Sequence, residues 1–398
     1  MINRNRLTEV RAAEEARFRE SNPKSAEAAE DRAFGWHQGV PFHWMRDWPS
    51  PFPLTAAHAH GATLTTLDGD VLDDLITHVF SGERCKLMFI GDVAQLPPVG
   101  SDQSPALVGD SLRIQYDLFL AEIQLTEVIR QAQDSGILYN ATLLRYLIVQ
   151  RLGELPKFTT HGYSDVVKVD SDIQPLIEDM YGRYTMDDTI IITRSNKRAN
   201  LYNQQVRVRI LGYEDEINSG DRMMVLKNNY FWLKPEEYTA GFIANGDILE
   251  IKRVLGFEDR GKFRFCRAIV KMPDYSDMPE FETILHCNTI WDNHSSMPSE
   301  ERMALAQLIS EDYLDLPDAR QIKKAVKSDP YFNALQVKFS YAITCHKAQG
   351  GQWPCVFTDQ GYITDEMAGV ELNRWFYTAF TRAQEKLYLV GFEDQFFE

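Results

Sequence analysis

Cysteine is scarce and scattered in this 398-residue chain. Its five cysteines are spread over the chain and form no Cys-x-x-Cys pair, so they support neither a disulfide framework nor a zinc site, and we expect no metal held by their thiolates. No stretch reaches the ~18 apolar residues of a membrane span, and no leader of charged, apolar and small residues opens the sequence. These absences predict a cytoplasmic protein with reduced thiols, no membrane contact and no metal site.

Basic residues are fewer than acidic residues. The 42 Lys and Arg residues face 58 Asp and Glu residues, which gives a net charge of −16. This balance argues against a broad, histone-like grip on nucleic acid, because most of the surface repels a polyanion. It leaves room for a narrow groove lined by a few basic and aromatic groups. The hydrophobic fraction of 44% excludes a wholly disordered chain, and the length predicts two to three domains.

The first part of the chain changes character near residue 70. Residues 1–70 alternate charges and then continue with Trp, His and Pro, without helical or strand periodicity, so we expect an irregular or disordered segment. The apolar spacing of 71–80 predicts an amphipathic helix, and the run 86–92 predicts a buried strand. A helix followed by an apolar strand is typical of an α/β protein with a parallel sheet.

The rest of the chain predicts a second α/β unit with an insert. Residues 189–194 and 386–391 have the character of buried strands. Between them lies an insert of about 213–335, in which short alternating segments separated by Gly, Asn and Asp predict a small β-barrel and residues 298–330 predict a charged helical part. We therefore expect 71–185 to form a partial first domain and 186–398 a second domain that carries this insert.

Two segments of the first half carry side chains suited to phosphate chemistry. Asp92 follows the strand of FIGDVAQLPPVG at the sheet edge where α/β proteins bind ligands, and Gln95 lies within reach of a phosphate oxygen or an attacking water. Arg130, in LTEVIRQ, has the charge needed to neutralise a γ-phosphate. The structural alternatives are a turn capped by Asp92 and a solvent-exposed arginine.

Two further segments lie near the end of the chain. In YAITCHKAQGG a strand leads into His346, Lys347, Gln349 and the glycine pair that begins at Gly350. Polar donors suit phosphates, and glycine lets the backbone approach a ligand closely. In YTAFTRA a helix carries Arg382 just before the last strand, where it contacts either a ligand or the helix dipole.

Taken together and in this order, these strings resemble the later motifs of superfamily 1 helicases, most closely the RecD-like branch with its UvrD-like C-terminal domain. GDVAQLPPV is similar to the third motif, LTEVIRQ to the fourth, the string around His346 to the fifth and YTAFTRA to the sixth. The resemblance covers residues 71–398. It implies a RecA-like P-loop NTPase helicase core with parallel sheets, one RecA-like domain partial and the other complete, and an inserted β-barrel or SH3-like subdomain.

The resemblance also implies a function: ATP-dependent translocation on single-stranded DNA and unwinding of duplex junctions, in DNA repair or recombination, with ATP and Mg²⁺ as cofactors. Gln95, Arg130 and Arg382 would be the catalytic residues of this ATP hydrolase, and they would sense the γ-phosphate and stabilise charge on it. The nucleotide would be bound by Asp92, Gln349 and Gly350. The nucleic acid would be bound by Thr193, Asn196, Thr344, His346 and Lys347. An aromatic residue such as Tyr230, Phe231 or Trp232 would stack on a base or belong to the core of the insert.

The sequence departs from the helicase pattern where the nucleotide should be held. It contains no Gly-x-x-x-x-Gly-Lys-Ser/Thr loop, and no Asp-Glu pair on a strand precedes the helix at 71–80. Because these groups hold the triphosphate and its metal, we expect no ATPase activity from this chain alone. Three explanations stay open: a shortened gene product in which 1–66 is foreign sequence, an inactive relative that binds nucleic acid or a protein partner, and a partner chain that supplies the missing half.

Overall fold

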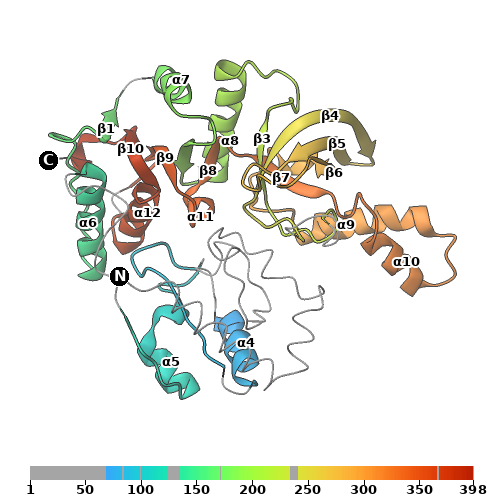
Figure 1. The fold of residues 1–398 in the computed structure, drawn as a ribbon, viewed down its shortest axis with the longest axis horizontal. Helices are drawn as coiled ribbons and strands as arrows, with labels where there is room; N and C mark the ends of the chain where they lie inside the picture. Colours follow the sequence, from blue (N-terminus) through green and yellow to red (C-terminus); the bar gives the residue numbers. More distant parts are fainter. Residues whose placement is uncertain are drawn as a thin grey trace.

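The computed structural model describes residues 69–82, 85–98, 100–123, 135–170, 172–233, 241–364 and 367–397. The structure has three parts: a small N-terminal part, a sheet covered by helices, and a barrel with a helical hairpin (Figure 1). The expectations for residues 1–68 and for Arg130 lie outside the described residues.

The N-terminal part is built around helix α4 (Gly69–Phe80), which confirms the predicted amphipathic helix. Its apolar stripe is buried against the 3₁₀ turn η3 (Pro105–Leu107) and helix α5 (Gly109–Tyr116). The prediction of a buried strand at 86–92 is wrong: this segment has no strand partner, and Met88 is 80% exposed. An apolar run becomes a strand only when a neighbouring strand satisfies its backbone groups, and the described residues before Val166 contain no strand.

The sheet at the centre of the molecule has five strands in the order β1-β10-β9-β2-β8, and all neighbours are parallel. The predicted strands at 189–194 and 386–391 are confirmed as β2 and β10. Successive residues of β2 face opposite sides, so Ile191 packs under one helical layer and Ile192 under the other. The strands are β1 (Val166–Val169), β2 (Thr189–Thr193), β8 (Ala342–Thr344), β9 (Trp353–Asp359) and β10 (Ala383–Val390).

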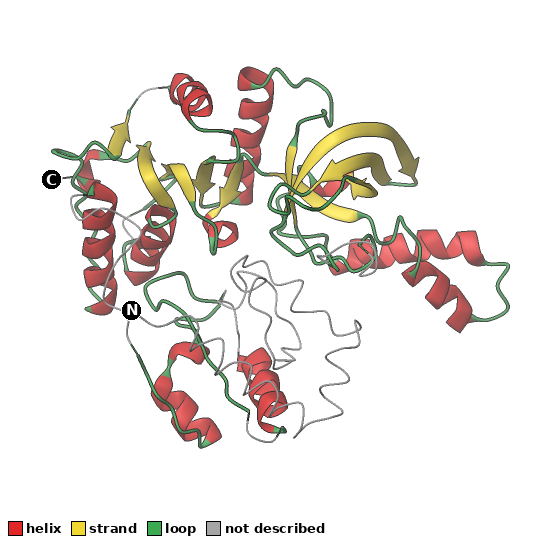
Figure 2. Ribbon diagram, viewed as in Figure 1, coloured by secondary structure: helices red, strands yellow, loops and turns green. Residues whose placement is uncertain are grey.

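Helices cover both faces of this sheet (Figure 2). One face carries α7 (Gln174–Arg183) and α8 (Asn196–Gln205), and the other carries α6 (Gly136–Val149) and α12 (Val370–Phe380). This α/β arrangement with a parallel sheet is the one expected for the second RecA-like domain.

The domain boundary expected at residue 185 falls inside this sheet domain. Strand β1 pairs with β10 from Val166 opposite Leu387 onward, and α6 packs on α12. Both elements precede residue 185, yet their partners lie about two hundred residues further along the chain. The sheet domain therefore begins before the predicted boundary. The local sequence pattern could not predict this, because it carries no information on which distant strand a segment pairs with.

The predicted insert is a closed barrel, and it lies between α8 and β8. The chain leaves the sheet through a π-helical turn, η4 (Val206–Ile210), and returns through β7 directly into β8, so the insert ends at residue 339 rather than 335. A buried ion pair fixes the entry, with Arg207 Nε 2.8 Å from Asp221 Oδ1. The barrel strands are β3 (Arg222–Val225), β4 (Ile248–Arg260), β5 (Phe263–Lys271), β6 (Phe281–His286) and β7 (Leu335–Phe339).

A helical hairpin interrupts the barrel between β6 and β7 and extends away from the sheet (Figure 1). Its helices are α9 (Ser299–Ser310) and α10 (Ala319–Lys327), which confirms the helical prediction for this stretch. The remaining short helices of the described chain are α11 (Cys345–Ala348), η5 (Cys287–Thr289), η6 (Glu311–Tyr313) and η8 (Asp394–Phe396).

Candidate nucleic-acid interface

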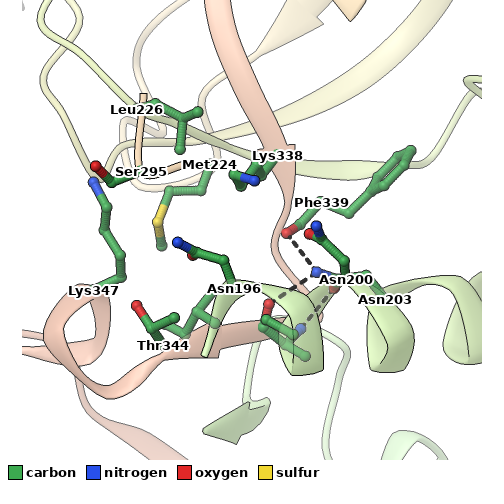
Figure 3. A pocket seen from close by; sticks show the side chains of 13 residues that line it. Asn196, Asn200, Asn203, Met224, Leu226, Ser295, Lys338, Phe339, Thr344 and Lys347 are labelled. Carbon is green, nitrogen blue, oxygen red and sulfur yellow. Dashed lines mark hydrogen bonds between the residues drawn. The ribbon is translucent and has the colours of Figure 1, made fainter. Parts of the chain in front are cut away.

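The carboxyl ends of β2 and β8 lie side by side, with Thr193 opposite Thr344. Strand β2 leads into α8 and strand β8 leads into α11, so the first turns of both helices meet at this edge. A small pocket opens there, between α8, α11 and the barrel (Figure 3). Its polar lining comes from all three sides of the pocket and consists of Asn196, Asn200, Asn203, Ser295, Lys338, Thr344 and Lys347.

Local interactions hold the walls of this pocket. Ser195 caps α8, because its side chain accepts a hydrogen bond from the main-chain nitrogen of Arg198, and this starts the helix at Asn196. The buried Asn203 donates to the carbonyls of Phe339 at 3.0 Å and Ala342 at 2.9 Å (Figure 3). Asn203 therefore fixes the connection from β7 to β8, which follows Lys338 of β7.

Two lysines are the charged groups of the pocket. Lys347 Nζ donates to Asn245 Oδ1 at 2.6 Å, and Lys338 Nζ donates to the main-chain oxygen of Asp292. Burial, and secondarily the nearby charge of Lys338, lowers the pKa of Lys347 to about 8. Burial also lowers the pKa of Lys338. Among the described residues no carboxylate contributes to the pKa of Lys347, whereas the Asp292 carboxylate attracts Lys338. An anion that enters the pocket would therefore stabilise above all the charge of Lys347.

The residues expected to bind nucleic acid occupy different positions. Asn196, Thr344 and Lys347 line the pocket together. His346 is exposed but does not line it, and Thr193 is fully buried, with Oγ1 donating to the Ser195 carbonyl at 3.1 Å. Thr193 thus closes the turn into α8 and does not reach the surface.

Sequence reasoning missed Lys338, Asn200 and Ser295, which line the pocket, and Asn245, which accepts the hydrogen bond of Lys347. One signal was available for Lys338, because a buried strand such as LQVKF accommodates a lysine only where its ammonium group reaches a polar environment. The two asparagines have no such signal, since their positions depend on how the barrel meets α8 and α11.

The residues expected to bind or sense a nucleotide hold the N-terminal part against the sheet domain. Asp92 Oδ1 accepts from Arg145 at 2.5 Å, and Asp92 Oδ2 accepts from the hydroxyl of Tyr377 at 2.8 Å. The buried side chain of Gln349 donates to the Leu96 carbonyl at 2.9 Å. The segment 92–98, which includes the half-buried Gln95, is therefore docked on α6, α12 and the turn after α11.

Arg382 lies under the same docked segment and is itself buried. Its Nε donates to the Thr378 carbonyl at 3.0 Å and its Nη1 to the Gly351 carbonyl at 3.0 Å. Thr378 in turn accepts a hydrogen bond on Oγ1 from the Leu96 main chain at 2.9 Å. The structure thus brings Arg382 and the turn that contains Gly350 together with the segment of Gln95, through hydrogen bonds within the protein.

The described residues do not fit a triphosphate with its metal ion. The polar atoms of Asp92, Gln349 and Arg382 are engaged as above, and the described chain offers no group of three or more His, Cys, Asp or Glu side chains able to hold a metal. The string nearest to a phosphate loop, GFEDRGKF, forms the antiparallel turn between β4 and β5. A phosphate loop requires a strand that leads into a helix N-terminus, so this turn does not provide one.

Comparison with known proteins identifies a helicase segment in this region. Residues 339–390, from the end of β7 to the end of β10, match the UvrD-like helicase C-terminal domain. This match covers the turn from β8 into α11 and Arg382 but not the turn from β2 into α8, and it supports a relationship to superfamily 1 helicases. Among the helices that the structure describes, none combines the length and apolar character needed to cross a bilayer.

The chain also resembles one curated protein and several solved helicase structures, at low sequence identity. The chain is 21% identical over 348 residues to an uncharacterized protein of Acanthamoeba polyphaga mimivirus, which covers 76% of this chain and 68% of that protein. The Pif1 helicase from Candida albicans aligns with 84% of this chain and 72% of its own, at 15% identity and a TM-score of 0.35. A Bacteroides Pif1 helicase in complex with ADP-AlF3 and ssDNA aligns with 84% and 70%, at 12% identity and a TM-score of 0.41. TM-scores below 0.5 do not establish a common arrangement of the whole chain.

Proposed function

We propose that this chain is a superfamily 1 helicase-type protein of the RecD-like branch that binds single-stranded DNA at the pocket between α8, α11 and the barrel. The observation that carries the proposal is the convergence of Asn196, Thr344, Lys338 and Lys347 on one pocket. Amide, hydroxyl and ammonium groups are the donors that bind phosphate oxygens, and they bind them without regard to base sequence. Because the pocket is narrow, the net charge of −16 does not exclude this binding.

Anisotropy of a fluorescein-labelled oligo(dT) tests this function. We expect wild-type binding that weakens with salt, and roughly tenfold weaker binding with a shallower salt dependence for Lys347→Ala. Lys323→Ala, which removes an exposed lysine of α10, is the matched control and should bind as wild type. Equal affinity of wild type and Lys347→Ala at every salt concentration would contradict the proposal.

We further propose that the chain does not hydrolyse ATP by itself. The missing phosphate loop and the internal hydrogen bonds of Arg382 support this. The role in DNA repair or recombination, the action on duplex junctions and the cytoplasmic location stay predictions.

A second candidate function is ATP-driven unwinding in complex with a polypeptide that holds the nucleotide. The specific observation that favours it lies in the N-terminal part. There, Leu87 and Phe89 pack on the α4–α5 cluster, whereas Met88 and Ile90 alternate with them and face solvent. An apolar face of this kind is normally covered in an α/β domain. Co-expression with the product of the gene next upstream tests this: DNA-stimulated ATP turnover of the pair would support it, and absence of both turnover and complex would contradict it.

A further inference from the structure

The arms of the loop between β3 and β4 approach each other beside the pocket. Asn229 and Ile243 form an antiparallel bridge, with main-chain N–H···O distances of 2.8 and 2.9 Å in the two directions. Tyr230 and Phe242 are the next residues on the two arms, so they lie opposite each other. Their rings stack with centroids 5.1 Å apart and an angle of 23° between the planes. The bridge therefore holds this aromatic pair in a defined orientation.

Tyr230 differs from the two aromatic residues that follow it. The indole nitrogen of Trp232 donates to the Asn333 carbonyl at 2.8 Å, and Trp232 packs against the barrel core. Phe231 is half-buried and contacts Trp232 edge to face, with centroids 5.0 Å apart. Tyr230 remains 65% exposed, although it is a large aromatic side chain. Of the three candidates for base stacking, the geometry thus favours Tyr230.

A chain of hydrogen bonds connects this tyrosine to the pocket. Asn228 Nδ2 donates to the Tyr230 hydroxyl at 3.2 Å, and Asn228 Oδ1 accepts from the main chain of Asn245 at 2.8 Å. Asn245 Oδ1 accepts from Lys347 Nζ at 2.6 Å. The aromatic pair and the phosphate-binding lysine are therefore parts of one connected surface.

We propose that the Tyr230–Phe242 pair is a stacking platform for a nucleobase of the strand whose phosphates occupy the pocket of Lys338 and Lys347. The inference rests on the proposed function and adds to it the class of group that is recognised beyond the phosphate. An aromatic face accepts any base, because every base has a π-face, so the platform binds without sequence preference. The ring that carries the contact is that of Tyr230, and Phe242 supports it from behind.

Two oligonucleotides of equal length, oligo(dT) and an abasic strand with the same phosphates, separate base stacking from phosphate binding. We expect Tyr230→Leu to bind oligo(dT) roughly tenfold more weakly than wild type does, and to bind the abasic strand as wild type does. Tyr230→Phe keeps the ring and should bind both strands as wild type does. Tyr146→Leu, which removes an exposed tyrosine of α6, is the control and should change neither affinity.

An unchanged oligo(dT) affinity in Tyr230→Leu would overturn the platform, as would an equal loss on both strands. A loss in Tyr230→Phe would assign the effect to the hydroxyl and its bond to Asn228, and would overturn it as well. If the wild type binds oligo(dT) through Lys347 while Tyr230→Leu has no effect, the platform alone fails. If the wild type binds neither strand, the proposed function fails and the platform fails with it.

Discussion

The side-chain amide of Gln349 donates a hydrogen bond to the main-chain carbonyl of Leu96 at 2.9 Å, across 253 residues of sequence. Gln349 follows the turn that forms the candidate DNA pocket, and Leu96 follows Gln95. The bond therefore connects the pocket side of the sheet domain with the segment that resembles the third helicase motif. It also explains why Gln349 is buried.

Gln349→Ala should release the segment 92–98 from the sheet domain. The variant leaves the Leu96 carbonyl buried without its donor, which typically costs about 1–3 kcal/mol. We expect faster hydrogen–deuterium exchange in 92–98, where the Leu96 amide is protected by Thr378, and little change in β2 or β9. Gln352→Ala, at an exposed position three residues away, is the control. Unchanged exchange in 92–98 would show that the contact does not hold this segment.

Single-strand binding should weaken as the pH rises through 8. Burial lowers the pKa of Lys347 to about 8, so the ammonium is charged at pH 7 and largely neutral at pH 9. Only the charged form attracts a phosphate, so Lys347 takes up a proton when DNA binds at a pH at which the free side chain is neutral. Anisotropy titrations at constant ionic strength should show this loss. Lys347→Arg, whose guanidinium stays charged, should lose much less affinity than wild type between pH 7 and pH 9.

The barrel should lose stability in mild acid because of His286. This residue is 1% exposed, lies edge-on to the rings of Phe263 and Phe265, and has its pKa lowered by burial from 6.5 to about 4. The folded state favours neutral imidazole, so its contribution to stability is complete above pH 6.5 and declines as the pH falls toward 4. Between pH 7.5 and pH 5 the decline is about 2 kcal/mol.

Urea unfolding at these two pH values measures the decline. His286→Leu should lose less stability than wild type between pH 7.5 and pH 5, since leucine does not titrate. His161→Leu, which changes an exposed histidine before β1, should retain the wild-type dependence on pH. An identical pH dependence in His286→Leu and wild type would exclude His286 as the cause.

Sequence periodicity predicted correctly the elements that are determined by the spacing of their own apolar residues. The apolar residues of 71–80 are spaced for a helix with one buried face, and those of 189–194 are continuous, as in a strand that is buried on both faces. The run at 86–92 has the same apolar character but is not a strand, because a strand also requires a neighbour. Strand β1 shows the converse, since its partner β10 lies more than two hundred residues away and decides the domain boundary.

The candidate site was predictable only in part. Asn196, Thr344 and Lys347 stand at the ends of predicted strands, where parallel sheets collect functional groups. Lys338 and Asn245 reach the pocket from the barrel, and no motif signals how the barrel is oriented. The choice among Tyr230, Phe231 and Trp232 likewise depends on packing, because the sequence alone makes all three equivalent.

The central claim is that this chain binds single-stranded DNA but does not hydrolyse ATP. The most direct test is to measure ATP turnover on the same preparation that binds oligo(dT). We expect salt-sensitive binding and no ATP hydrolysis, with or without the oligonucleotide. Hydrolysis that is stimulated by single-stranded DNA and lost in Arg382→Ala would contradict it.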